Sequence, residues 1–347
     1  MKKFFIILFV LMFFLCGCQV REINDVSFVV AIGVDEAENN DYLVSFLTAI
    51  PEAISSSEKD SEKVLLNSYT THNVISASDS LSDALNKKTD FSHCRLIAFS
   101  NNVASKGLEQ FKKTLLNEKE FRPDTLTVIT NCSPKDFFQS HTEKIKINPS
   151  EYFELMFSSK YAPTSISHTI KDFFANKDMV IPTIDLNNKR GGGVLKNNTL
   201  VTTLSPDQIV LYKLLKGDLS HSYIDFLNND IVISASPEKK TDIKVKRSKI
   251  PEIYITLYLN GEIISEETDI SYKKAINGLS DECEKLINSM AKQYNCDFLS
   301  LKKRFRPLFL TIQNYENYIN SPDYKRANYY VKIIYSDIKT GERIFKV

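Results

Sequence analysis

The feature that most constrains the fold is a stripe of apolar residues near the C-terminal end of the chain. Its members recur at offsets of 0, 4, 7, 8, 11, 12 and 15, the spacing of one face of an α-helix. β-rich runs at 231–235, 243–246, 252–263 and 327–336 surround this stripe. We therefore expect an antiparallel sheet packed on one long amphipathic helix, with a closing hairpin of 327–336 and 343–347. The stripe consists of Leu279, Cys283, Leu286, Ile287, Met290, Ala291 and Tyr294.

The first half of the chain has the pattern of a mixed sheet with helices on it. Residues 27–34 and 42–50 predict a hairpin, because two β-rich runs flank a turn-rich stretch. Further along, strands and helices alternate, which favours right-handed crossovers between parallel neighbours. The remaining expected strands are 64–71, 95–99 and 126–130. The expected helices are 73–85, with Asn73 as cap and Ile75, Leu81 and Leu85 on its apolar face, 104–116, and a short one from Pro134.

A weaker sheet signal follows, with strands at 180–186 and 192–204 around a glycine-rich turn. Ser205-Pro206 and Gly217 bracket a helix, because proline suits a first turn and glycine the position after the last one. We expect a multidomain α+β (mixed α/β) chain with a small middle domain. The predicted divisions are a signal peptide at 1–17, an N-terminal domain at 18–185, the middle domain at 186–228 and a C-terminal domain at 229–347.

The N-terminus has the pattern of an export signal. Two lysines precede an apolar run at 4–15, which lies within the roughly 7 to 15 residues of a signal peptide and below the roughly 20 of a membrane span. The run ends in Leu-Cys-Gly-Cys at 15–18, which resembles a bacterial lipobox. We expect Cys18 to carry acyl chains, palmitate among them, that hold the protein on a membrane. The alternative is an ordinary cleaved signal with Cys18 as a spare thiol.

The charge of the chain limits the kinds of partner that it can bind, and its cysteine content limits the disulfides that it can form. The full chain has 44 basic and 43 acidic residues, so we expect no nucleic acid partner and no purely electrostatic attraction to an anionic bilayer. The cysteines beyond Cys18 are too few and too scattered for a disulfide framework, and no pair has metal-ligand spacing. We expect buried free thiols, with a single bridge as the alternative, at Cys94, Cys132, Cys283 and Cys296.

No motif in the sequence indicates catalysis, a cofactor or a metal, and we expect a binding or structural protein. Four histidines follow a serine, but adjacent side chains point to opposite faces of a strand and no Gly-x-Ser-x-Gly elbow is present. The Gly191-Gly192-Gly193 run lacks the Lys and Ser or Thr of a P-loop and predicts a turn or bulge, where only glycine permits positive φ or close backbone approach. Acidic residues at 281–284 suit the solvated face of the C-terminal helix. The four histidines are His93, His141, His168 and His221.

Several short segments beyond residue 18 occur in a distinctive order. They are Arg21–Asn24, Val29–Asp35, Arg95–Phe99 followed by Ala104 and Gly107, Phe121–Asp124, Tyr294–Phe298, and the last strand with Gly341. In this order they resemble the Ger(x)C family of spore germination lipoproteins, over most of the mature chain. The sequence departs from the family at 19–20, where an aromatic and an acidic residue are common, and at 117–120, where Arg-Asp-Pro-Glu is common.

The resemblance implies a three-domain mixed α/β protein on the outer face of the spore inner membrane. In that family the chain is the C subunit of a nutrient germinant receptor, and it works with two integral membrane proteins, the A and B subunits. The B subunit resembles amino-acid transporters and is the natural nutrient site. The resemblance therefore implies neither catalytic residues nor a cofactor for this chain.

Two other classes of protein are alternatives. An extracytoplasmic solute-binding lipoprotein would also be anchored through Cys18 and would deliver ligand to a transporter. Such proteins usually have two similar α/β lobes, whereas the last third here predicts an antiparallel sheet. A lipid-anchored hydrolase comes third, because the sequence lacks a convergent acid, base or nucleophile.

Overall fold

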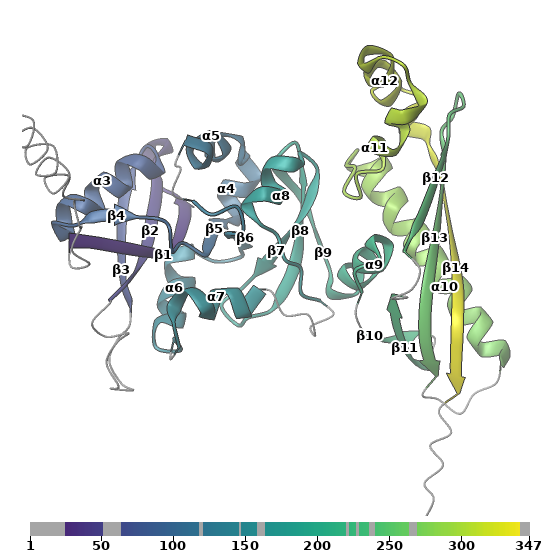
Figure 1. The fold of residues 1–347 in the computed structure, drawn as a ribbon, viewed down its shortest axis with the longest axis horizontal. Helices are drawn as coiled ribbons and strands as arrows, with labels where there is room; N and C mark the ends of the chain where they lie inside the picture. The colour runs from purple at the N-terminus through teal and green to yellow at the C-terminus, as the bar shows by residue number, and fades with distance from the viewer. Residues whose placement is uncertain are drawn as a thin grey trace, which may run out of the picture.

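Two sheets, each with its own helices, lie along the long axis of the molecule (Figure 1). The expectation of a multidomain mixed α/β chain is confirmed. Cys18, His221, Gly341 and the predicted strand at 343–347 lie outside the described residues. The structure is a computed structural model and describes residues 25–50, 64–117, 121–145, 147–157, 164–219, 222–226, 229–235, 240–263 and 269–340.

The first sheet is mixed, as the sequence predicts. Its strand order is β3-β2-β1-β5-β6-β7-β8-β9, with β4 paired to β1. The pairs β1–β5, β5–β6 and β6–β7 are parallel, and the outer pairs are antiparallel, including the predicted β1–β2 hairpin. The strands are β1 (Val26–Glu36), β2 (Tyr42–Ala49), β3 (Val64–Thr71), β4 (Lys88–Asp90), β5 (Leu96–Ser100), β6 (Leu126–Thr130), β7 (Met179–Ile184), β8 (Arg190–Lys196) and β9 (Thr199–Leu204).

Helices cover both faces of this sheet, so its central strands are buried on both sides. In β5, Ile97 and Phe99 face one hydrophobic core, and Leu96 and Ala98 face another. The first core includes residues of α3 (Val74–Leu85), α4 (Asn101–Lys106), α5 (Glu109–Asn117) and α8 (Ile170–Ala175), and the second includes residues of α6 (Pro134–Thr142) and α7 (Pro149–Phe157). Figure 1 shows the two groups on opposite sides of the strands.

Local signals placed most helix ends correctly, with two corrections. Asn73 caps α3 as predicted, and its side chain accepts a hydrogen bond from the backbone N–H of Ser76 (2.9 Å). The predicted apolar face of α3 is wrong in part, because Ile75 is exposed while Val74 and Ala77 are buried beside Leu81. The single helix expected over 104–116 is two helices, α4 and α5, because the chain changes direction at Gly107, where φ is +115°.

The expected turn between the two strands exists as the β7–β8 connection at 185–189, but the glycines lie after it, inside strand β8. A Cβ at Gly192 would come within 3.0 Å of Val180 Cγ1, so glycine serves close packing here and not a reversal of the chain. A second reversal, which was not predicted, lies at Asn197 and Asn198, whose φ angles are 49° and 64°. The run predicted as one strand at 192–204 is therefore the hairpin β8–β9.

The second sheet follows α9 (Pro206–Lys216), whose Ser205 and Gly217 caps are as predicted. Its strand order is β10-β11-β13-β12, all antiparallel, and β14 pairs with β13. The β13–β14 pair is parallel, so the expectation of a wholly antiparallel C-terminal sheet is wrong. The chain between these strands is a long helical crossover, and such a connection returns it in the same direction. The strands are β10 (Ser222–Phe226), β11 (Asn229–Ala235), β12 (Asp242–Lys246), β13 (Glu252–Ile263) and β14 (Asn328–Thr340).

The crossover begins with α10 (Asp269–Asn288), which contacts β14, and ends with shorter helical segments. Five residues of the predicted apolar stripe are buried, namely Leu279, Cys283, Leu286, Ile287 and Met290, while Ala291 and Tyr294 are partly buried against the same core. That core also contains residues of α9, β8 and β13, so it joins the two sheets. The shorter segments are η3 (Ser289–Gln293), α11 (Lys302–Phe305), η4 (Arg306–Leu308), α12 (Ile312–Ile319) and η5 (Tyr324–Arg326).

Candidate functional site

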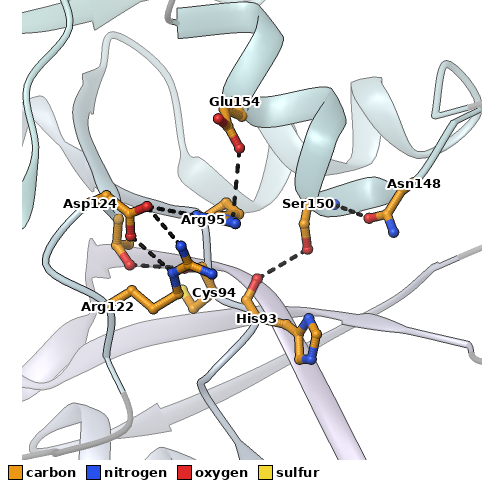
Figure 2. A network of polar contacts seen from close by, with 9 residues as sticks. His93, Cys94, Arg95, Arg122, Asp124, Asn148, Ser150 and Glu154 are labelled. Carbon is orange, nitrogen blue, oxygen red and sulfur yellow. Dashed lines mark hydrogen bonds and ion pairs between the residues drawn. The ribbon is translucent and has the colours of Figure 1, made fainter.

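Two polar sites lie where segments distant in the sequence meet. The first is a group of charged side chains at the start of β5 and β6, shown in Figure 2. Arg95 directly precedes β5, and its backbone N–H and C=O are both used, donating to Val30 (2.9 Å) and accepting from Leu126 (2.9 Å). This pairing fixes the residue between β1 and β6, so the direction of its side chain is set by the sheet.

Asp124 accepts from two arginines and is the centre of this charged group (Figure 2). Arg122 reaches both carboxylate oxygens, with Nε 3.0 Å from Oδ1 and Nη2 2.9 Å from Oδ2, and Arg95 Nη1 lies 3.1 Å from Oδ2. The hydrogen bond from Arg122 holds the pKa of the Asp124 carboxyl below its usual range. Arg95 Nε also lies 4.0 Å from Glu154 Oε2 on α7. The group therefore joins two loops and a helix.

Backbone contacts hold the same corner together. The hydroxyl of Thr125 donates to the C=O of Cys94 (2.9 Å), and the hydroxyl of Ser150 donates to the C=O of His93 (3.1 Å). The C=O of Pro123 accepts from Lys171 of α8 (3.0 Å). The 95–99 and 121–124 segments, which the sequence shows far apart, are thus neighbours in the fold.

The second site joins the two sheets through the 294–298 segment. Cys296 Sγ donates to the C=O of Leu195 in β8 (3.4 Å), and the backbone N–H of Asp297 donates to Asp178 Oδ2 (2.9 Å). The Asp297 carboxylate accepts from the backbone N–H groups of Leu301 (2.7 Å) and Lys302 (2.9 Å) and so fixes the turn before α11. Burial raises the pKa of Asp297 to about 6, against the lowering effect of these two hydrogen bonds.

A cavity of about 130 Å³ lies beside this joint. His168 lines it, with Nδ1 2.5 Å from the hydroxyl oxygen of Thr127 and Nε2 3.0 Å from the sulfur of Met179. Burial lowers the pKa of His168 to about 4, so the imidazole is neutral at pH 7. The other polar or charged residues of the wall are Ser167, Asp172, Asn176, Asp178, Tyr212, Lys216 and Ser300.

The serine–histidine pairs do not assemble a catalytic triad among the described residues. In the pair Ser140–His141 the side chains touch, with 2.9 Å between Oγ and Nδ1, but Nε2 of His141 contacts the Asn188 amide oxygen (2.9 Å) and no carboxylate. His93 is exposed. Within the described ranges, no three His, Cys, Asp or Glu side chains are grouped so that they could hold a metal ion.

The structure describes four of the cysteines discussed above but not Cys18. Cys94, Cys132, Cys283 and Cys296 are free thiols. The predicted lipidation site, Cys18, lies outside the described residues, and none of the helices that the structure describes is long and apolar enough to cross a bilayer. The joint around Asp178 and Asp297 was not predicted from the residues. Its only sequence signal was the 294–298 segment of the family resemblance.

Comparisons with known proteins match nearly the whole chain. The family described as "Spore germination protein N-terminal domain" matches residues 19–186. The family described as "Spore germination B3/ GerAC like, C-terminal" matches residues 190–338. Both polar sites are built from residues within these matches, and the joint contains residues from each.

A curated relative and a solved structure agree with these matches. Spore germination protein A3 of Bacillus subtilis (strain 168) is 22% identical over 237 residues, which are 65% of this chain and 63% of that protein. The crystal structure of the GerBC protein has a TM-score of 0.52 and 15% identity, covering 88% of this chain and 96% of that one, and this likeness shows the fold. The resemblance seen in the ordered segments is thus confirmed, and the chain belongs to the Ger(x)C family of spore germination proteins.

Proposed function

We propose that this protein is the lipid-anchored C subunit of a nutrient germinant receptor and is required for spore germination. The observation that carries the proposal is the consecutive match of two spore germination families over 19–186 and 190–338. Coverage of both halves in their family order favours a germination subunit over a chain that shares only one domain with the family. The subunit assembles with the integral membrane A and B subunits and has no catalytic step of its own.

The proposed anchor is Cys18, acylated after removal of residues 1–17. The lipobox pattern at 15–18 supports it, because the apolar run ends at Leu15 and the small residue Gly17 directly precedes this cysteine. Two or three acyl chains give durable attachment without a spanning helix, since each buried methylene contributes roughly 0.8 kcal/mol. The protein then lies on the outer face of the spore inner membrane. The domain limits 18–185, 186–228 and 229–347 are part of the same proposal.

The joint at Asp297 is proposed to keep the two halves of the subunit in one arrangement, and the charged group around Asp124 is proposed to hold together one corner of the first half. Neither contains a nucleophile activated by a base, and both join segments that are distant in the sequence. A rigid arrangement suits a subunit that presents surfaces to two membrane partners.

The alternative is a solute-binding lipoprotein, and proteins of that class usually have two similar α/β lobes. Here the two sheets differ in topology, since the first has a parallel centre and the second has antiparallel strands with one parallel addition. This difference favours the receptor subunit.

The experiment is a pull-down of the tagged full chain from membranes of sporulating cells, with mass spectrometry of its partners and of its N-terminal peptide. Acylated Cys18 recovered with a transporter-like protein and a second multispanning protein is the expected result. Recovery with an ABC permease would instead support the solute-binding alternative. Cys16→Ala is the matched control for Cys18→Ala, since both cysteines lie in the lipobox and only the second is proposed to be acylated.

A further inference from the structure

The second sheet ends in an exposed apolar surface next to α12, which none of the contacts described above uses. We define the apolar tip as Leu308, Leu310 and Ile312, whose exposed fractions are 42%, 101% and 60%. Single exposed leucines are ordinary on protein surfaces, but three within five residues of chain form a local concentration. In Figure 1 the tip belongs to the end of the molecule opposite β1, where α12 and the β12–β13 connection lie.

The backbone directs these side chains outward. Phe309 has extended φ and ψ angles of −129° and 134°, and its own side chain is buried. Because successive side chains of an extended segment point to opposite sides, Leu308 and Leu310 point away from the core. Thr311 is also extended and caps α12, so Ile312 begins the helix at the same end.

The tip is held in place by cations. Arg306 Nη1 donates to the C=O of Phe309 (2.7 Å), and Arg247 Nη1 donates to the C=O of Leu308 (3.4 Å). The Arg247 guanidinium also lies 4.3 Å from the centre of the Phe309 ring. The Tyr318 hydroxyl donates to the C=O of Ser248 (3.0 Å), which fixes the β12–β13 connection against α12. The exposure of the apolar side chains is thus a property of a fixed backbone.

The charge around the tip is strongly basic, although the net charge of the whole chain is near zero. Residues 304–320 contain two basic residues, Arg304 and Arg306, and one acidic residue, Glu316. The β12–β13 connection, 247–251, adds Arg247 and Lys249 and no acidic residue. We define the basic rim as Arg247, Lys249, Arg304 and Arg306.

We propose that the apolar tip and its basic rim dock on an anionic lipid bilayer, with Leu310 inserted among the lipids and the rim on their head groups. Exposed apolar side chains surrounded by cations are the chemistry of interfacial membrane binding, in which apolar burial and attraction to anionic lipids act together. A bilayer is favoured over a protein partner because cations surround the projecting apolar side chains, and because the Leu308 and Phe309 carbonyls already accept hydrogen bonds from Arg247 and Arg306. The inference does not require the receptor assembly proposed above.

Together with an anchor at Cys18, this contact would lay the molecule along the membrane. The described chain begins at Asp25, close to β1, and the tip lies at the other end of the long axis (Figure 1). Two contacts at opposite ends fix the direction of the long axis along the membrane, which a single anchor leaves free to pivot.

The test uses the absence of tryptophan from the chain, so that Leu310→Trp introduces its single tryptophan, which is excited at wavelengths that the tyrosines do not absorb. The acylated full-length variant is reconstituted in vesicles of phosphatidylcholine and phosphatidylglycerol with brominated acyl chains, which quench tryptophan only at bilayer depth. Leu155→Trp is the matched control, because Leu155 on α7 is 58% exposed and outside the tip. We expect Leu310→Trp emission to shift to the blue and fall at least twofold, and Leu155→Trp emission to stay unquenched.

A second comparison adds Lys249→Gln and Arg304→Gln, two exposed rim residues, to the Leu310→Trp variant. We expect less quenching in this triple variant, and less in vesicles of phosphatidylcholine alone. A Leu310→Trp variant that floats with the vesicles but is quenched no more than Leu155→Trp would overturn the inference and leave the anchor standing. If Leu310→Trp is quenched although mass spectrometry finds its N-terminal peptide unacylated, the result would support insertion of the tip and overturn the proposed lipid anchor at Cys18.

Discussion

The backbone N–H of Asp297 donates a hydrogen bond to Asp178 Oδ2 over 2.9 Å, although 119 residues of sequence separate them. Asp178 precedes β7 of the first sheet, and Asp297 lies after α10 of the second half, so the bond crosses the joint between the sheets. His168 lines the cavity at the same joint. The pKa shifts of Asp297 and His168 have opposite consequences for stability, which gives two linked predictions.

The first prediction concerns Asp297, whose pKa is raised by burial from 3.8 to about 6. The folded state binds this proton more tightly than the unfolded state, so the contribution of Asp297 to stability is complete below about pH 4 and is lost as pH rises to about 6. The loss is about 3 kcal/mol by linkage. When the free energy of unfolding is measured with urea between pH 4 and 7, Asp297→Asn should lack the part of its decrease that comes from this carboxyl. Asp281→Asn, at an exposed position of α10, should keep it. An unchanged pH dependence in Asp297→Asn would show that the carboxyl does not titrate in this range.

The second prediction concerns His168, whose pKa is lowered by burial from 6.5 to about 4. The unfolded state binds this proton more tightly, so the contribution of His168 is complete above about pH 6.5 and is lost as pH falls to about 4. The loss is again about 3 kcal/mol. His168→Gln should therefore be less sensitive to acid than the wild type, relative to its own stability at pH 7. The exposed His93→Gln serves as control. Equal acid sensitivity of His168→Gln and wild type would contradict the assignment.

The third prediction concerns Gly33 in β1. A Cβ at this position would lie 2.5 Å from Pro134 Cβ and 2.9 Å from Phe138 Cε2 of α6, so strand and helix would have to separate. Gly33→Ala should lower the free energy of unfolding by about 1–3 kcal/mol. The same exchange at Gly192 meets only the side-chain ends of Val180 and Ile166, at 3.0 and 3.1 Å, and should cost less. Chemical denaturation of both variants gives the order, and the reverse order would be inconsistent with the packing of α6 on β1.

The sequence signals that correctly predicted structure were local ones. The Asn73 cap, the Ser205-Pro206 start and the Gly217 end of α9 each depend on a hydrogen bond or a φ angle within one turn of helix. The apolar spacing over 279–294 also worked, because one buried face over about four turns of helix produces a long periodic pattern.

Longer-range features were missed for physical reasons. The turn at Asn197-Asn198 was missed because β-rich residues continue on both sides of it, so 192–204 has the pattern of one strand. The parallel β13–β14 pair depends on where the crossover with α10 returns, and no single residue records that. The Arg95–Asp124 contact joins loops 29 residues apart, and it became visible only through the fold.

The fourth prediction concerns the thiols. Burial raises the pKa of Cys94 and of Cys283 to about 12, and Cys132, which is only partly buried, has a pKa of about 11. Thiols, unlike thiolates, react slowly with iodoacetamide. At pH 8 the native chain should resist alkylation, with Cys132 modified first, and unfolding in urea should expose Cys94, Cys283 and Cys296. Peptide mass spectrometry identifies which cysteines are alkylated over time. Rapid modification of Cys94 in the native chain would be incompatible with its burial.

The proposed receptor role is tested by nutrient-triggered germination of spores that lack this gene and any redundant paralogue, complemented with defined variants. We predict that spores without the gene fail to respond, that the wild type and Cys16→Ala restore the response, and that Cys18→Ala leaves it severely reduced. Deletion spores that germinate at the wild-type rate would contradict the receptor role, and full rescue by Cys18→Ala would contradict the lipid anchor.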